Sequence, residues 1–239
     1  MYFLNHTCRL PAENLALDEA LLTHAEGRDD TFEVLRLWEP AEPMVVAGRS
    51  SRVANEVNLP YCREQGVPVF RRSSGGAAIV TGPGCLMYAV VLDFRRRPEL
   101  RAIDSAHRFV MTTLQSALGR WLPAIAWQGT CDLTVGGRKF SGNSLRCVRN
   151  HLLYHGTLLY DFPLERIARC LGTPPREPEY RDHRPHERFV TNVAIGREQL
   201  TAALVDAWQA DEPFHGALDH CITELVAAKY SRDEWNLKL

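Results

Sequence analysis

The sequence of 239 residues lacks the paired cysteines that a disulfide framework or a zinc site would need. Its seven cysteines are odd in number, and no two of them form a Cys-x-x-Cys pair. They are Cys8, Cys62, Cys85, Cys131, Cys147, Cys170 and Cys221. Scattered thiols of this kind are typical of a reducing compartment, so we expect a cytoplasmic protein.

Long hydrophobic runs and a basic leader are missing as well. The first 20 residues, MYFLNHTCRLPAENLALDEA, contain no basic stretch followed by an apolar one, as a secretory signal would. No stretch approaches the roughly 20 apolar residues that a membrane-spanning helix requires. We therefore expect neither secretion nor insertion into a membrane.

Neither sign of charge is in excess, since 28 Lys and Arg residues stand against 29 Asp and Glu residues. No global field would attract the chain to nucleic acid or to an anionic membrane, so we expect neither as a partner. The hydrophobic content of 45% is enough to fill a substantial core.

The periodicity of apolar residues predicts alternating strands and helices. Strands are expected at residues 32–38, 44–47, 67–71, 77–80, 86–92 and 151–159. Helices are expected at residues 14–24, 60–65, 102–118, 164–171, 197–208 and 219–229. Residues 173–188 are rich in Pro, Arg and His, which indicates a long irregular connection along the surface. No repeat or linker divides the chain, so we expect a single α+β domain over residues 1–239, with a mixed β-sheet flanked by α-helices.

The densest chemical signal is the segment Arg71-Arg72-Ser73-Ser74-Gly75-Gly76-Ala77, which directly follows an expected strand. Glycines allow successive backbone N–H groups to converge on an anion, and arginines add charge-assisted bonds to phosphate or carboxylate. The alternative is an ordinary turn between strands with solvated arginines.

A second signal surrounds Lys139. Gly136-Gly137 predicts a two-residue hairpin, because glycine accepts the positive φ that such turns require. Lys139 would lie just past the turn, with the small residues Ser141 and Gly142 leaving room for a ligand. A fixed ammonium there could stabilise negative charge on a transferring group. The alternative is a solvated surface lysine.

The third signal is His155-Gly156-Thr157 within an apolar strand, where a glycine suggests the close approach of a ligand or another backbone. The alternative is a histidine satisfied within the core. Two histidine pairs have loosely metal-like spacing, but no cysteine or carboxylate completes a ligand set, so we predict no metal site.

Cys131, next to Asp132, is the cysteine closest in sequence to Lys139. It is the candidate nucleophile if the chemistry passes through a thioester. The alternative is that it acts only as a small hydrophobic side chain.

The three segments, in this order, resemble the catalytic domain shared by lipoate-protein ligases, octanoyltransferases and biotin-protein ligases. RRSSGGAAIV is similar to the family's Arg-Arg-x-Ser-Gly-Gly-Gly loop, GRKFSGNS to its lysine segment, and HGTLLYDF to the strand that follows. By this resemblance, Lys139 contacts the acyl carboxylate and the α-phosphate of an acyl-adenylate. A further set is implied to bind substrate or nucleotide: Arg71, Arg72, Ser73, Gly75, Gly76, Ala77, Asp132, Ser141, Gly142, His155, Gly156 and Thr157.

The resemblance also implies ATP with Mg²⁺, lipoate or octanoate, and a lipoyl-accepting protein domain as the partner. Three features depart from it. Ala77 and Thr81 stand where the ligases have a glycine and commonly a histidine, and the sequence ends near Trp235, where classical ligases continue into an accessory domain. Cys131 does not match the position of the transferases' nucleophile.

Three functions therefore stay open: an ATP-dependent ligase, which we favour and which a separate accessory subunit would complete, an ATP-independent octanoyl or lipoyl transferase, and a noncatalytic binding module.

Overall fold

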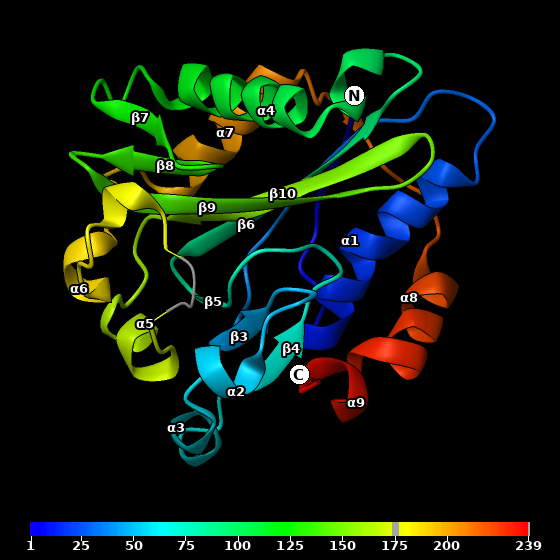
Figure 1. Ribbon diagram of the computed structural model, residues 1–239. Coiled ribbons are helices and arrows are strands. Elements are labelled where there is room, and N and C mark those ends of the chain that lie inside the picture. Colours follow the sequence, from blue (N-terminus) through cyan, green and yellow to red (C-terminus); the bar gives the residue numbers. More distant parts are fainter. Residues whose placement is uncertain (174–176, 239) are drawn as a thin grey trace.

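The computed structural model describes residues 1–173 and 177–238, which fold around two β-sheets (Figure 1). The larger sheet has the strand order β11-β1-β2-β6-β10-β9-β8-β7, and the smaller sheet has the order β4-β3-β5. The strands are β1 (Tyr2–Asn5), β2 (Val34–Trp38), β3 (Met44–Ala47), β4 (Val69–Arg71), β5 (Ile79–Thr81), β6 (Cys85–Asp93), β7 (Ile125–Gln128), β8 (Asp132–Val135), β9 (Arg138–Cys147), β10 (His151–Leu159) and β11 (Glu212–Pro213).

Helices lie on both sides of the larger sheet. They are α1 (Pro11–Glu26), α2 (Val53–Glu56), α3 (Leu59–Glu64), α4 (Ile103–Leu118), α5 (Glu165–Cys170), α6 (His186–Phe189), α7 (Arg197–Trp208), α8 (Asp219–Leu225) and α9 (Asp233–Asn236). Short turns are the 3₁₀ helices η1 (Pro98–Arg101) and η2 (Glu179–Arg181) and the π-helical turn η3 (Val226–Tyr230).

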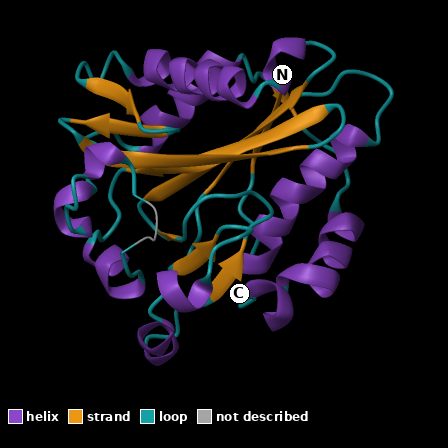
Figure 2. Cartoon of the chain, viewed as in Figure 1, coloured by secondary structure: helices purple, strands orange, loops and turns teal. Residues whose placement is uncertain are grey.

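β6 and β10 form the centre of the larger sheet, and every residue in both strands is buried. Side chains alternate between the two faces of a strand. Tyr88 and Val90 therefore pack toward α4 and α7, whereas Met87 and Val91 pack on the opposite face. Figures 1 and 2 show α4 and α7 above the sheet and α1 with the small sheet below it. The space between the two sheets is where the candidate site lies.

The sequence predicted this architecture well. The α+β class and the mixed sheet with flanking helices are confirmed, because β1 runs parallel to β2 while β6 pairs antiparallel with β2 and β10. The hairpin at Gly136-Gly137 is confirmed by φ angles of 57° and 72°. α1 begins at Pro11, earlier than expected, and the last helix gives way to a π-helical turn after Leu225.

Residues 173–188 were expected to form an irregular surface connection, and the part that the structure describes is mostly loop and turn that is at least partly exposed, while residues 174–176 lie outside the described residues. η2 and the start of α6 lie in this segment, and Arg181 is only 4% exposed. Arg181 and Arg184 stack on the ring of Phe189 at 4.8 and 5.5 Å. Polar composition indicated a solvated loop, but stacking on an aromatic ring folds the arginines inward.

Within residues 1–173 and 177–238, no helix is long and apolar enough to cross a membrane.

Candidate active site

Two cavities meet at the side chain of Lys139. The first, which we call the Trp38 lobe, has a volume of about 360 Å³, and its apolar wall comprises Leu15, Trp38, Val46 and Met87. The second, which we call the Phe189 lobe, has a volume of about 150 Å³. Lys139, Ala77 and Gly142 line both lobes.

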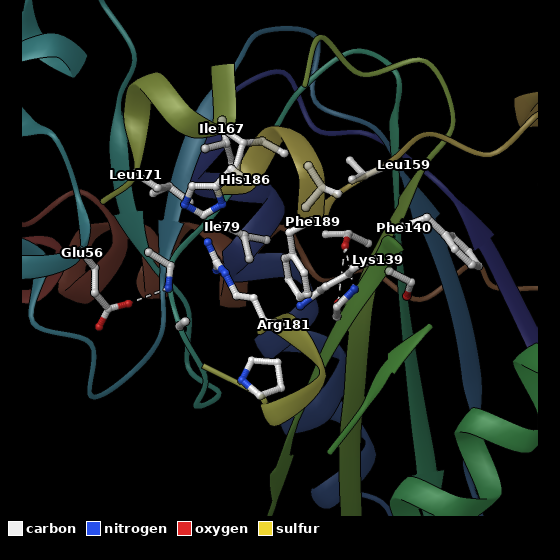
Figure 3. Close-up of a pocket in the computed structure, with 18 of the residues that line it drawn as sticks. Glu56, Ile79, Lys139, Phe140, Leu159, Ile167, Leu171, Arg181, His186 and Phe189 are labelled. Carbon is white, nitrogen blue, oxygen red and sulfur yellow. Dashed lines mark hydrogen bonds between the residues drawn. The ribbon is translucent and has the colours of Figure 1, made fainter. Parts of the chain in front are cut away.

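Aromatic and aliphatic side chains form most of the Phe189 lobe, including Phe140, Leu159, Ile167, Leu171 and Phe189. Polar side chains, among them Glu56, Arg181 and His186, also line it (Figure 3). Burial lowers the pKa of His186, which favours the neutral imidazole. The Glu56 carboxylate accepts bonds from the Ser51 hydroxyl at 3.0 Å and from the Ala78 amide at 2.8 Å.

Lys139 is the second residue of β9, immediately after the Gly136-Gly137 turn. Its Nζ atom lies 2.8 Å from Oδ1 of Asp132, which opens β8 on the other arm of the hairpin. The Lys139 side chain is 27% exposed and the Asp132 side chain 13% exposed, so the ion pair faces the cavity rather than bulk solvent. A Cβ atom at Gly142 would lie 2.7 Å from Cε and Nζ of Lys139. The lysine therefore occupies the space that a side chain at position 142 would need.

The glycine loop enters the site at Gly76 and Ala77, which line the Trp38 lobe. Gly76 has a φ of 88°, a conformation that L side chains rarely adopt. Arg72 holds the loop by donating to the carbonyl oxygens of Gly75 at 2.5 Å and Ala77 at 3.1 Å. Burial lowers the pKa of Arg72 to about 10, so the guanidinium stays charged at neutral pH.

Arg71, Ser73 and Gly75, which were expected to bind substrate or nucleotide, do not line either lobe. The Arg71 guanidinium is fully buried and donates to the carbonyl oxygens of Gly48 at 2.7 Å, Ser51 at 2.8 Å and Trp235 at 2.8 Å. Its Nη2 atom donates to the carbonyl of Lys238. The sequence had suggested that the N–H donors of Arg71 bind an anion, but they are bonded to these carbonyl oxygens instead.

A buried polar chain connects the glycine loop to α1 and β2. Ser74 Oγ lies 2.5 Å from His155 Nε2, and His155 Nδ1 lies 3.2 Å from Asp18 Oδ2. Asp18 Oδ1 accepts from Arg36 Nη1 at 2.5 Å. Because Asp18 accepts a hydrogen bond from Nδ1–H, Nε2 can accept a hydrogen bond from the Ser74 hydroxyl. The chain thereby fixes the loop against the floor of the Trp38 lobe, which Asp18 and His155 line.

Gly156 is needed for the close packing of β10 on β9. A Cβ atom at this position would lie 1.8 Å from Asn143 Oδ1. Asn143 also accepts from the Tyr88 hydroxyl at 2.6 Å and donates to the Cys131 carbonyl at 2.7 Å. Ser141 and Thr157, by contrast, line the Phe189 lobe.

Cys131 lines the Trp38 lobe, but its thiol is already bonded. Sγ donates to the Asn143 carbonyl at 2.9 Å. Burial, followed by the charge of Asp132, raises the pKa of Cys131 to about 11. At neutral pH the thiol is therefore almost entirely protonated, whereas a nucleophilic cysteine requires the thiolate.

The described residues contain no group of three or more His, Cys, Asp or Glu side chains that could hold a metal ion.

Several residues of the site were missed by the sequence reasoning. Trp38 and Asp18 line the Trp38 lobe, and Tyr180 and Arg181 come from the segment interpreted as a connection. Ser74 was inside the named glycine segment, but nothing in the sequence singled it out from Ser73. Asp18 stands beside Glu19 between apolar residues of α1, in a segment that also resembles the family, but the sequence assigned it no role.

A family model described as the lipoyl protein ligase A/B catalytic domain matches residues 10–208. The chain belongs to this family. It is 30% identical, over 80% of its length, to the "Probable lipoate-protein ligase A" of Mycoplasma pneumoniae, of which it covers 55%. It is 24% identical to the octanoyltransferase LipM of Geobacillus kaustophilus over 95% of its own length and 94% of that protein. The chain thus spans about half the length of the ligase relative and nearly the whole transferase.

Solved structures of lipoate-protein ligases share the fold. A lipoate-protein ligase A bound with ATP matches with a TM-score of 0.82 at 22% identity, covering 99% of this chain and 98% of that one. A bi-partite lipoate-protein ligase from Thermoplasma acidophilum, studied with its E2 lipoyl domain, matches with a TM-score of 0.82 at 21% identity, covering 99% of this chain and 95% of that one.

Proposed function

We propose that residues 1–239 act as one catalytic domain of an ATP-dependent lipoate-protein ligase. It activates lipoate or octanoate as an acyl-AMP and transfers the acyl group to a lysine of a lipoyl-accepting protein domain. The observation that carries the proposal is the junction of the two lobes at Lys139. Two adjoining chambers can hold an acyl carboxylate and a nucleotide phosphate close together, and such proximity accelerates their reaction.

The Trp38 lobe suits the acyl chain, because its inner wall is apolar and its volume of about 360 Å³ falls in the usual range for small-molecule sites. The Phe189 lobe suits the base of the nucleotide. Phe189, Ile167 and Leu171 supply apolar contacts there, and Arg181 and His186 supply polar groups. A lobe of about 150 Å³ is large enough for a flat ring, while the ribose and phosphates would extend toward Lys139.

In the first step an acyl carboxylate oxygen attacks the α-phosphorus of ATP, and pyrophosphate leaves. In the second step the acceptor lysine attacks the acyl carbon, AMP leaves, and the amine releases a proton. The Lys139 ammonium would stabilise the charge that develops on the phosphoryl and carboxyl oxygens. Gly142, Ala77 and Gly76 leave space for those groups, and Arg72 would keep the loop in place.

Magnesium would enter with ATP. The carboxylates that line the lobes are already paired: Asp132 with Lys139, Glu56 with Ser51 and the Ala78 amide, Asp18 with Arg36, and Glu177 with Arg181. Mg²⁺ commonly binds through substrate phosphates and few protein ligands, so these residues do not form a cage for it by themselves.

The comparisons support ATP and the acceptor indirectly. A structural neighbour was solved with ATP, and another is a bi-partite ligase studied with its E2 lipoyl domain. Because one structural neighbour is a bi-partite lipoate-protein ligase, we further propose that a separate accessory polypeptide takes part in the transfer step.

The test is intact-mass measurement of a lipoyl domain incubated with the protein, lipoate or octanoate, and ATP with Mg²⁺. A mass increase of one acyl group that requires ATP and disappears when the acceptor lysine is replaced by arginine would support the proposal. Labelling that proceeds without ATP, from acylated acyl carrier protein as the only donor, would contradict it.

An octanoyltransferase is the second candidate, because the LipM relative matches over nearly its whole length. Its nucleophile would be Cys131. The raised pKa predicts that iodoacetamide at pH 7.5 modifies the exposed Cys147 well before Cys131, and that Cys131→Ser keeps ATP-dependent activity. Early alkylation of Cys131 together with an acyl-thioester at that residue, detected by peptide mass spectrometry, would favour the transferase.

A further inference from the structure

Tyr180 is hydrogen-bonded to Asp132, the carboxylate that pairs with Lys139. Its hydroxyl donates to Asp132 Oδ2 at 2.7 Å, while Asp132 Oδ1 lies 2.8 Å from Lys139 Nζ. The three groups form one chain, in which the tyrosine restricts the carboxylate to a single orientation toward the lysine.

The position of Tyr180 is itself fixed from several sides. Its ring packs on Phe189 with centroids 5.3 Å apart. Arg184 donates to the Tyr180 carbonyl at 2.7 Å and to the Gly137 carbonyl at 3.1 Å, which ties the tyrosine to the hairpin turn. Gly129, with a φ of 57°, leaves room for the ring, since a Cβ atom there would lie 3.3 Å from Tyr180 Cε1.

The same segment also holds the backbone of the lysine. The Thr191 amide donates to the Lys139 carbonyl at 2.9 Å, and Arg138 Nη2 donates to the Val190 carbonyl at 2.6 Å. Residues 177–191 therefore contact Lys139 at two points: through its main chain and, by way of Asp132, through its ammonium.

We propose that Tyr180 is a positioning residue. Through Asp132 it fixes the position of the Lys139 ammonium, and through its packing on Phe189 it couples that position to the wall of the Phe189 lobe. The inference rests on the proposed function for its catalytic consequence but not for its structural one. Burial, and then Asp132, raise the pKa of Tyr180 well above its usual value, so the phenol stays a donor throughout the working pH range. A ligand that orders Phe189 and Arg181 would thereby also order the lysine.

The matched control is Tyr160, whose hydroxyl donates to both oxygens of Glu39 at 2.9 Å, away from both lobes. Tyr160→Phe removes the same kind of bond as Tyr180→Phe. The chain also has built-in references, because its lysines are Lys139, Lys229 and Lys238. Lys229 pairs with Glu19, and Lys238 lies over the Trp235 ring.

The first readout does not depend on activity: competitive acetylation of the three lysines with a limiting amine reagent, followed by peptide mass spectrometry. Tyr180→Phe should raise the labelling of Lys139 several-fold relative to Lys229 and Lys238, and Tyr160→Phe should not. Unchanged labelling of Lys139 in Tyr180→Phe would overturn the inference, whether or not the protein proves to be a ligase.

The second readout is pyrophosphate exchange. We expect Tyr180→Phe to lower kcat by about tenfold, with little change in KM for lipoate, because the apolar wall of the Trp38 lobe is unchanged. Adding Tyr180→Phe to Asp132→Asn should cause little further loss, since the tyrosine acts through the carboxylate. A loss confined to KM for lipoate, or full additivity with Asp132→Asn, would contradict the positioning role. Absence of exchange in the unmodified protein would count against the proposed function alone.

Discussion

Gly142 leaves the space in which the Lys139 side chain lies across the junction of the lobes. A side chain at this position would meet Cε and Nζ of the lysine at 2.7 Å. Lysine is flexible, so the protein should still fold, but the ammonium must move away from Asp132. Displacing a reacting group by about 1 Å can cost on the order of 100-fold in rate.

The prediction at the residue scale is that Gly142→Ala lowers the rate of acyl-adenylate formation by about 100-fold. The urea concentration at the midpoint of unfolding should change little. Gly27→Ala is the control, because a Cβ atom there meets only backbone oxygens at ordinary distances of 3.6 and 3.7 Å. Equal activity in the two variants would show that the lysine does not act from the position seen here.

The surroundings of two arginines could not be predicted from the sequence. Arg71 and Arg72 are adjacent cations before a glycine turn, and this pattern suggested a site for an anion. The structure buries both guanidinium groups against backbone carbonyls, a use of arginine that depends on which segments the fold brings near. These partners lie far away in the sequence, so the local pattern around the arginines could not identify them.

At the element scale, the end of β6 is tied to neighbouring segments through Asp93. Its carboxylate accepts from the Arg95 side chain and amide and from the Phe32 amide, and His151 Nε2 lies 3.4 Å away. Burial alone would raise the pKa of Asp93, but the bonds from Arg95 outweigh it and lower the pKa to about 2.

This pKa predicts an acid-dependent contribution to stability. A folded-state pKa below the unfolded value of about 3.9 stabilises the protein above that pH, by on the order of 2 kcal/mol, and the contribution is lost as the pH falls from about 4 toward 2. Urea unfolding should therefore show a large difference in the free energy of unfolding between the protein and Asp93→Asn at pH 7, and this difference should narrow below pH 4. The exposed Asp211→Asn should show no gap, and a pH-independent gap for Asp93→Asn would be inconsistent with this pairing.

The elements that the sequence predicted best are those whose periodicity is strong. The helix expected at residues 197–208 and the strand expected at 151–159 have the observed bounds, and the helix expected at 102–118 begins one residue later than predicted. The short β1, β7 and β11 were not predicted, whereas the equally short β3 was, because Met44–Ala47 is a continuous apolar run. Their existence depends on pairing with the edges of a sheet that forms elsewhere.

On the scale of the whole molecule, Arg71 joins the C-terminal residues to the glycine loop. Its side chain bonds the carbonyls of Trp235 and Lys238, the Asn236 side chain accepts from the Arg71 amide at 3.1 Å, and Trp235 Nε1 donates to the Arg71 carbonyl at 2.8 Å. β4, the turn at Gly48 and α9 thus share one buried cation.

We predict that Arg71→Ala lowers the free energy of unfolding by about 3 kcal/mol or more, because several buried carbonyls lose their donor. Arg71→Lys should restore little of it, since an ammonium cannot reproduce the planar fork of donors. Urea unfolding of both variants measures this, and recovery of full stability by lysine would argue that only charge is needed at this position.

The candidate site was predictable in part. The segments around Lys139, Gly76 and His155 were recognised from sequence, since each combines chemistry with small residues. The wall formed by Arg181 and Phe189, on which Tyr180 packs, was not, because stacking and a tyrosine–carboxylate bond leave no periodic pattern. The two-lobed shape likewise requires both sheets to be in place.

The most direct test of the central claim, that Lys139 stabilises acyl adenylation at the junction of the lobes, is ATP–pyrophosphate exchange without any acceptor protein. We predict exchange that requires lipoate or octanoate, and a loss of about 100-fold or more in Lys139→Ala, with the acid that gives the faster exchange identifying the preferred substrate. Exchange that proceeds equally well in Lys139→Ala would contradict the claim.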